Sequence, residues 1–342
     1  MALDKDTFRF DFMRVRHFFV VLSFVVIGLS LWEWQAVGLK KYGLDFVGGT
    51  EVVVRFDPAV SIGAVRSAVE KAGVENAVVQ ELEVASGEGS EFSIRVKLPP
   101  HANPATGAEE DDANSKMPDR IVAALRNIPN TSIELRKEDY VGPTIGDEIR
   151  QSGLTALALS FLGLLVYLTI RFEMRFAFGA MFAIVHDVMV TAGIFVLSGR
   201  ELSASVLAAL LTIIGYSLND TIVIFDRIRE NVQRTYKKGG ADRKITVGKD
   251  FLELINISIS ETLSRTLLTS LTTLFVVATL LALGGSAMSD LAFTLFVGII
   301  TGTYSTLFIA CPVVVALERF GATPKTAKAK SASSGAAKHA QL

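Results

Sequence analysis

Two aspartates lie inside stretches that otherwise have the composition of membrane-spanning helices. Asp187 falls within residues 176–197 and Asp220 within residues 202–225. A carboxylate at the centre of a bilayer costs about 2.5–3.5 kcal/mol unless it is paired, hydrated or protonated. Because such groups usually serve to move protons or ions, the two aspartates are the first candidates for a functional site.

The neighbours of Asp220 are polar as well. Ser217 precedes it by three residues, which places both on one face of a helix, and Asn219 adjoins it. We therefore expect Ser217 and Asn219 to support Asp220. The alternative is a carboxylate near a helix end that is solvated by water, although the side chain of aspartate is too short to reach far.

Arg265 opens the next apolar stretch and is expected at a depth comparable to that of Asp220 on the antiparallel neighbouring helix. Glu261, Arg265, Thr269 and Thr272 share one helical face and predict a polar stripe that leads inward. The alternative is an ordinary arginine at a cytoplasmic helix end.

His186 and Asp187 are adjacent at the centre of their stretch. Neighbours in a helix diverge by about 100°, so we expect each side chain to find its partner on another helix and not to pair with the other. A place in a proton pathway and a purely structural, hydrogen-bonded role both remain open for this pair.

Gly298 and Gly302 have the spacing G-x-x-x-G in the last apolar stretch. Small residues at this spacing let two helices approach closely. We expect helix packing at these two positions.

The composition limits the classes of function. Half of the residues are hydrophobic and 20% are charged, as expected for a membrane protein with substantial polar parts. The net charge of −1 gives no indication of a nucleic-acid partner, and the one cysteine, Cys311, excludes an internal disulfide. The sequence contains no glycine-rich phosphate loop, catalytic triad or metal-ligand spacing, so we expect neither an enzyme nor a cofactor.

Six stretches are long enough to span a bilayer, and Lys and Arg collect before the first and after every even-numbered one. This pattern predicts cytoplasmic termini and one large external (periplasmic) domain. The predicted segments are a cytoplasmic start (1–17), span 1 (18–37), the external domain (38–149), span 2 (150–170), span 3 (176–197), span 4 (202–225), a cytoplasmic loop (226–263), span 5 (264–283), span 6 (291–317) and a disordered tail (318–342).

The external segment carries its own fold signal. Strand and helix patterns alternate in the order βαββαβ, over residues 51–56, 61–73, 77–84, 91–98, 117–127 and 131–141. This order predicts a ferredoxin-like α/β sandwich. The acidic, proline-bearing residues 99–116 are expected to form a mobile loop in it.

Five motifs in order resemble SecF, a subunit family of the bacterial Sec protein-translocation machinery. They are GLDFVGGTEV (43–52), VGPTIGDEI (141–149), VHDV (185–188), GYSLNDTIVIFDRIREN (215–231) and ETLSRTLLTSLTT (261–273). The resemblance covers about residues 10–320 and implies half of a resistance–nodulation–division (RND) transporter fold, with SecD as the other half.

The resemblance also implies a function and partners. It implies that a complex with SecD uses the proton-motive force to help exported preproteins emerge from the SecYEG channel, with Asp220 and Arg265 as functional residues. Further implied contacts are SecA, indirectly, YajC, YidC and membrane lipid of the bacterial inner membrane. The rival hypotheses are a proton-coupled half-transporter that exports a lipid or drug, and a structural scaffold in which Asp220 can be replaced without effect.

Overall fold

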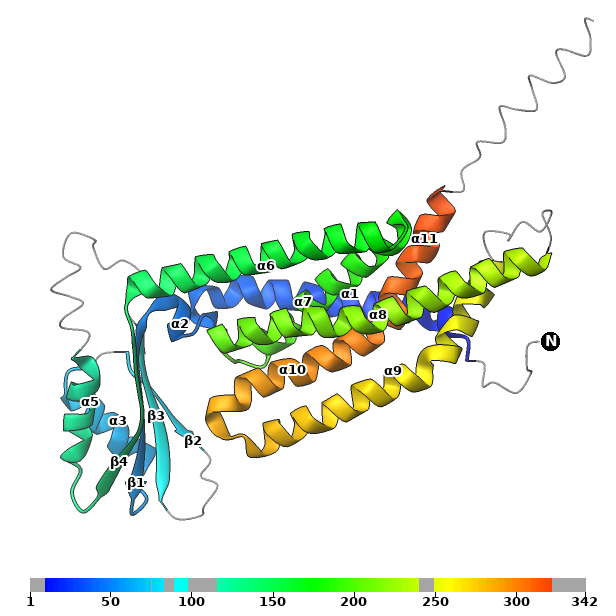
Figure 1. Cartoon of the computed structure of the whole chain (residues 1–342). Coiled ribbons are helices and arrows are strands. Elements are labelled where there is room, and N and C mark those ends of the chain that lie inside the picture. The colour runs from blue at the N-terminus through cyan, green and yellow to red at the C-terminus, as the bar shows by residue number, and fades with distance from the viewer. Residues whose placement is uncertain (1–9, 75, 83–88, 98–115, 240–248, 322–342) are drawn as a thin grey trace, which may run out of the picture.

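The computed structural model describes residues 10–74, 76–82, 89–97, 116–239 and 249–321. In this part of the chain, six helical segments are long and apolar enough to cross a membrane, as the sequence predicted. They are α1 (Phe12–Val37), α6 (Pro143–Arg171), α7 (Met174–Leu197), α8 (Ala204–Gly239), α9 (Lys249–Leu283) and α10 (Gly285–Ser305) with α11 (Cys311–Gly321). The six segments form one elongated bundle (Figure 1).

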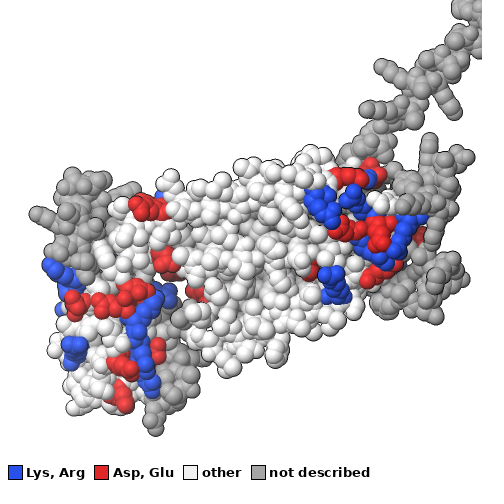
Figure 2. All heavy atoms as spheres, in the orientation of Figure 1, with Lys and Arg blue, Asp and Glu red and all other residues white. Residues whose placement is uncertain are grey.

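The bundle has a centre and an outside. Most of α7 and of the α10–α11 segment and half of α8 are buried, whereas α1, α6 and α9 are largely exposed. In the view of Figure 2, Lys, Arg, Asp and Glu collect at the two ends of the molecule and leave a belt between them with almost none. Such a belt is what a bilayer requires of a spanning bundle.

The helices extend beyond the predicted spans. The segment predicted as a cytoplasmic loop, 226–263, is helical over most of its length, because α8 continues to Gly239 and α9 begins at Lys249; residues 240–248 lie outside the described part. Arg227 of α8 forms an ion pair with Glu261 of α9 at 2.6 Å, which joins the two extensions, and a second one with Glu230 of its own helix at 2.6 Å. Hydropathy marks only the apolar part of a helix, and this polar continuation was therefore missed.

The last span is not one regular helix. A turn of π-helix, Thr306–Ala310, separates α10 from α11. Pro312 has no amide hydrogen to donate to the preceding turn, and a wider turn just before it accommodates this loss.

The segment between α1 and α6 begins with a short 3-10 helix (Gly38–Lys41) and α2 (Leu44–Val47). It then forms β1 (Gly49–Asp57), α3 (Ile62–Lys71), β2 (Val78–Leu82), β3 (Ser90–Lys97), α5 (Met117–Arg126) and β4 (Ser132–Val141). The strands form an antiparallel sheet in the order β2-β3-β1-β4. This confirms the predicted ferredoxin-like sandwich, which we call the α/β domain.

The two faces of the sheet differ. The α3 and α5 helices cover one face, where Val52, Val54 and Phe56 enter a buried core (Figure 1). The face without helices carries charge: Glu51 pairs with Arg95 at 2.8 Å and with Lys137 at 2.7 Å. Burial alone would raise the pKa of Glu51, but the hydrogen bond from Lys137 and the charge of Arg95 outweigh it, and the pKa of this carboxyl lies below its ordinary value.

Two predicted features fall outside the described residues. These are most of the acidic loop at 99–116 and the tail from residue 322 onward.

Candidate functional site

Asp220 lies in the centre of the bundle, on the side of α8 that faces α9 and α10. Its side chain is 4% exposed. The hydroxyl of Ser270 on α9 donates to Asp220 Oδ2 over 3.3 Å, and the hydroxyl of Thr303 on α10 lies 2.9 Å from that of Ser270. A buried carboxylate can accept several hydrogen bonds, so one long bond leaves Asp220 poorly satisfied.

Arg265 lies close to Asp220 but does not pair with it. Its side chain is exposed on the outer surface of α9. Among the described residues it forms no ion pair with Asp220, although it is near enough to act on the carboxylate electrostatically. The two charges therefore share a layer of the bundle, with one inside and the other on the surface.

The predicted polar stripe on α9 is wrong by one position. The buried polar residues are Thr262, Thr266 and Ser270, not the face that carries Arg265 and Thr269. The two faces lie about 100° apart, and both carry hydroxyl groups at helical spacing, so periodicity alone could not choose between them. Ser270 is consequently a site residue that the sequence reasoning missed.

The predicted supports of Asp220 are also corrected. Asn219 is exposed and points away from the centre, and Thr269 is exposed, with its hydroxyl bonded to carbonyls of its own helix. Ser217 is buried but donates to Asp187, at 2.5 Å, instead of supporting Asp220. Residues three apart share a helical face only approximately. Here Ser217 faces α7, where it contacts Asp187, and Asp220 faces α9, where it contacts Ser270.

Asp187 is the better satisfied of the two carboxylates. It is 1% exposed, and its Oδ2 accepts from Ser217 on α8 and, at 2.8 Å, from Ser305 on α10. Its Oδ1 lies 2.9 Å from His186 Nδ1. The expectation that His186 and Asp187 do not pair with each other is therefore wrong, because flexible side chains on adjacent residues can turn back across the helix surface.

His186 continues this network toward the outside of the bundle. Its Nε2 lies 3.1 Å from the hydroxyl of Tyr304 on α10, which lies 3.3 Å from the hydroxyl of Ser23 on α1. The chain of contacts thus joins α1, α7, α8 and α10. The expectation that each member of the pair also has a partner on another helix agrees with these contacts.

Gly298 and Gly302 lie where α10 packs against α8. A Cβ atom at position 298 would come within 2.1 Å of Ile213 Cδ1, and one at position 302 within 3.0 Å of Ser217 Cβ. The absence of a side chain at these positions brings α10 close enough for Ser305 to reach the same carboxylate as Ser217.

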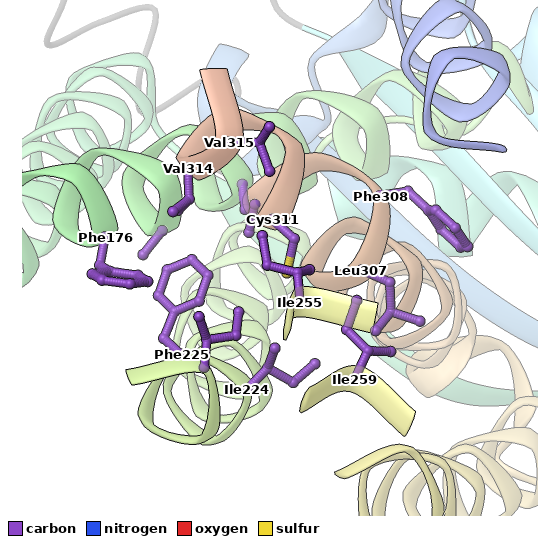
Figure 3. Close-up of a cluster of buried hydrophobic side chains, with 14 of the residues drawn as sticks. Phe176, Ile224, Phe225, Ile255, Ile259, Leu307, Phe308, Cys311, Val314 and Val315 are labelled. Carbon is purple, nitrogen blue, oxygen red and sulfur yellow. The ribbon is translucent and has the colours of Figure 1, made fainter. Parts of the chain in front are cut away.

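Apolar clusters bound the two acidic sites along the bundle. Toward the α11 end, Ile224 and Phe225 of α8 pack with Phe176, Cys311 and neighbouring residues (Figure 3). Toward the α/β domain, Val206, Leu210 and Ile213 pack with Phe195 and Leu202. Both carboxylates are therefore enclosed in the state that the structure describes.

Six membrane-spanning segments, hydrogen-bonded carboxylates at their centre and an α/β domain between the first two spans define a class of multi-pass membrane protein. In this class, a charged layer inside the bilayer is joined to a domain outside it.

Comparisons with known proteins identify the family. The family model described as "Protein export membrane protein SecD/SecF, C-terminal" matches residues 121–319, and the "SecD/SecF GG Motif" matches residues 41–60. The chain is 38% identical to "Protein translocase subunit SecF" of Rickettsia typhi, over 89% of this chain and 91% of that protein. The corresponding protein of Vibrio alginolyticus is 37% identical, over 90% of this chain and 89% of that protein.

A solved structure agrees with this result. SecDF of Thermus thermophilus, described as "a translocon-associated membrane protein", matches with a TM-score of 0.73 and 34% identity, over 93% of this chain and 40% of that longer chain. The chain belongs to the SecF family of protein translocase subunits. The predicted family and the predicted role in protein translocation are confirmed.

Proposed function

We propose that this chain works with SecD in the bacterial inner membrane and uses the proton-motive force to promote late steps of protein export through the SecYEG channel. SecA would act on the same channel indirectly, and YajC and YidC would be further neighbours. The likeness to one half of a SecDF chain supports the partnership with SecD. The role requires no covalent catalysis and no cofactor.

The observation that carries the proposal is the state of Asp220. It is buried at mid-bundle, has one weak hydrogen-bond donor in the described part of the chain, and lies near an arginine that faces outward. Protonation would remove the cost of an unpaired charge in this place, and loss of the proton would restore it. Asp220 would therefore favour different helix arrangements in its two protonation states, with Arg265 as a fixed positive charge at the SecD interface.

The available energy is sufficient for such a cycle. One elementary charge that crosses a potential of 100 mV releases about 2.3 kcal/mol, which shifts a two-state equilibrium by about fifty-fold. We place Asp187 and His186 in the same polar layer of the proton pathway, joined to Asp220 through α8 and α10.

The charged cleft of the α/β domain gives little support to the rival exporter hypothesis. The cleft between the open face of the sheet and the bundle has a volume of about 520 Å³ and is lined by Glu51, Arg95, Lys137 and Glu201, among others. An apolar lipid or drug bound in this cleft would displace water from these charged groups and could not replace the hydrogen bonds that they make to water.

The central experiment is protein export into inverted vesicles, with and without an imposed proton gradient. Asp220→Asn keeps the shape of the side chain but cannot titrate, so we expect normal assembly with SecD, loss of the gradient-dependent stimulation, and nearly unchanged export driven by ATP. The matched control is Asp226→Asn, an exposed acid on the same helix that pairs with Arg171. Full gradient dependence in Asp220→Asn would favour the scaffold hypothesis.

The orientation is proposed from the Lys and Arg residues that collect at the end of the bundle opposite the α/β domain (Figure 2). Arg14 lies in the first turn of α1, Arg171 ends α6, and Arg234 lies near the end of α8. A cysteine at Asp119, in a Cys311→Ser background, should react with an impermeant reagent from outside the cell. One at Arg234 should react only after the membrane is opened. The opposite pattern would reverse the proposed topology.

A further inference from the structure

A short segment between α1 and β1 is bonded to the start of α8, the helix that carries Asp220. The Leu202 amide donates to the Lys41 carbonyl over 2.7 Å, and the Gly43 amide donates to the Leu202 carbonyl over 2.6 Å. These two bonds form a parallel β-bridge between Tyr42 and Leu202. The carboxylate of Asp45 accepts from the amide of Ala204, the first residue of α8, over 2.8 Å.

The segment fits closely against both parts of the molecule. A Cβ atom at Gly43 would lie 2.9 Å from the Leu202 carbonyl oxygen. Gly49 opens β1 with φ +148°, and a Cβ atom there would lie 2.3 Å from the Val96 carbonyl oxygen of β3. Both positions require glycine, so residues 41–49 touch α8 at one end and the sheet at the other without room for adjustment.

Apolar contacts fix the segment to the bundle. Tyr42 and Phe46 pack on the cluster that includes Phe195 and Leu202. The Lys41 ammonium lies 3.9 Å from the centre of the Trp34 ring and donates to the Trp34 carbonyl over 2.9 Å. The segment is therefore held by backbone bonds, a helix cap and partly buried rings together.

A second contact between the two parts is of a different kind. Glu201, just before α8, pairs with Lys97 at 2.6 Å and with Arg95 at 3.7 Å, across the charged cleft. These side chains are 26–29% exposed. Partly hydrated ion pairs contribute little to stability, so this contact adds little to the connection that the backbone bonds make. Lys97 also donates to the Tyr42 carbonyl over 3.0 Å and pairs with Gly49 in the sheet, so it lies against the same segment.

We propose that residues 41–49 form a rigid connector that passes displacements of α8 to β1, with Asp45 as its positioning residue. The proposal rests on the Asp220-driven movement of α8 proposed above. Asp220 follows Ala204 by 16 residues, which is about 24 Å of stiff helix. A shift at the acid therefore reaches Asp45, and the sheet begins four residues later.

The first test locks the connector in the complex with SecD. Paired β-strand residues lie close enough for a disulfide, so Tyr42→Cys with Leu202→Cys, in a Cys311→Ser background, can be oxidised or reduced in the same vesicles. A rigid connector predicts equal gradient-dependent export in the two redox states. Loss of that export on oxidation, with recovery on reduction, would overturn the proposal, because the connector would then have to open.

The second test cuts the connector. Asp45→Ala should abolish gradient-dependent export and leave export driven by ATP and assembly with SecD intact, whereas Asp45→Asn retains an acceptor oxygen and should recover part of the stimulation. The control is Asp147→Ala, an exposed acid at the same end of the bundle that pairs with Arg150. Wild-type gradient dependence in Asp45→Ala would overturn the assignment.

A movement readout separates transmission from a merely structural role. A cysteine at Glu91, on the cleft wall, should be labelled by an impermeant maleimide at least about twofold faster when a gradient is applied, and this increase should vanish in Asp45→Ala. An unchanged increase in that variant would contradict transmission through Asp45. Asp220→Asn, tested in parallel, distinguishes the two failures: if it keeps full gradient dependence the proposed function fails, and if only the Asp45 results fail the connector fails.

Discussion

The two carboxylates inside the bundle are similar in sequence setting and opposite in structural setting. Asp187 accepts from Ser217 and Ser305 and contacts His186 Nδ1, at distances of 2.5–2.9 Å, while among the described residues the one donor to Asp220 is Ser270, at 3.3 Å. The first is held by three helices and the second is nearly free of partners. Burial of a carboxylate therefore does not by itself show what the group does, because the number of its hydrogen-bond donors decides how firmly its charge is held.

The largest expected effect is on the stability of the protein, and it should differ between variants of Asp187 and of Asp220. Asp187→Ala leaves the hydroxyls of Ser217 and Ser305 and the His186 ring without their partner, and each buried polar group left unsatisfied costs about 1–3 kcal/mol. We expect poor folding or a strongly lowered melting temperature of the detergent-purified complex. Asp220→Ala should melt close to the wild type. Equal melting temperatures for the two variants would remove the distinction between a fixed and a free carboxylate.

The next effect tests the charge beside Asp220. Arg265→Ala should lose gradient-dependent export, since no fixed positive charge would then favour the ionised acid, and Arg265→Lys should keep part of it because the charge remains. The measurement is export into vesicles with and without a gradient. Arg234→Ala, at an exposed arginine near the end of α8, is the control and should behave as the wild type.

A smaller effect concerns the close contact between α8 and α10, the helices that carry Ser217 and Ser305, which donate to Asp187. Gly298→Val places atoms where Ile213 now lies, and overpacking of this kind costs about 1–3 kcal/mol. We expect a lowered melting temperature that Ile213→Ala partly restores in the double variant. Gly163→Ala, on α6 where a Cβ meets no atom within 4 Å, should have no effect. Failure of the double variant to recover would argue against this contact as the cause.

The smallest effect contrasts both acids with Glu51, a carboxylate outside the membrane whose ion pairs lower its pKa. A lowered folded-state pKa means that ionised Glu51 stabilises the α/β domain above its ordinary pKa of about 4.3, and that this contribution is lost as the pH falls through the lowered value. In a soluble fragment of residues 40–145, which has its own core and should melt cooperatively, Glu51→Gln should reduce the acid-dependent loss of stability by about 1 kcal/mol or less. An unchanged pH profile would assign the acid sensitivity to other groups.

Much of the architecture followed from the sequence alone. The six spans and the βαββαβ order were predicted from local or periodic features, and the same features drew attention to Asp187 and Asp220, which the structure finds buried. The length of an apolar stretch, the alternation of a strand and the cost of a charge in hydrocarbon depend on a short segment alone. They can therefore be predicted without knowing which segments are neighbours in the fold.

The tertiary structure decided which polar groups meet. It placed Ser270 at Asp220 in place of Asn219 or Thr269, turned Ser217 toward Asp187, joined His186 to its neighbour, and bonded Asp45 to the start of α8. When a helix carries hydroxyl groups on several faces, its sequence pattern does not show which of these faces turns toward the centre of the bundle. The rotation comes from packing, from the close contacts at Gly298 and Gly302 among others, because a neighbouring helix must be present before a face can be called inner or outer.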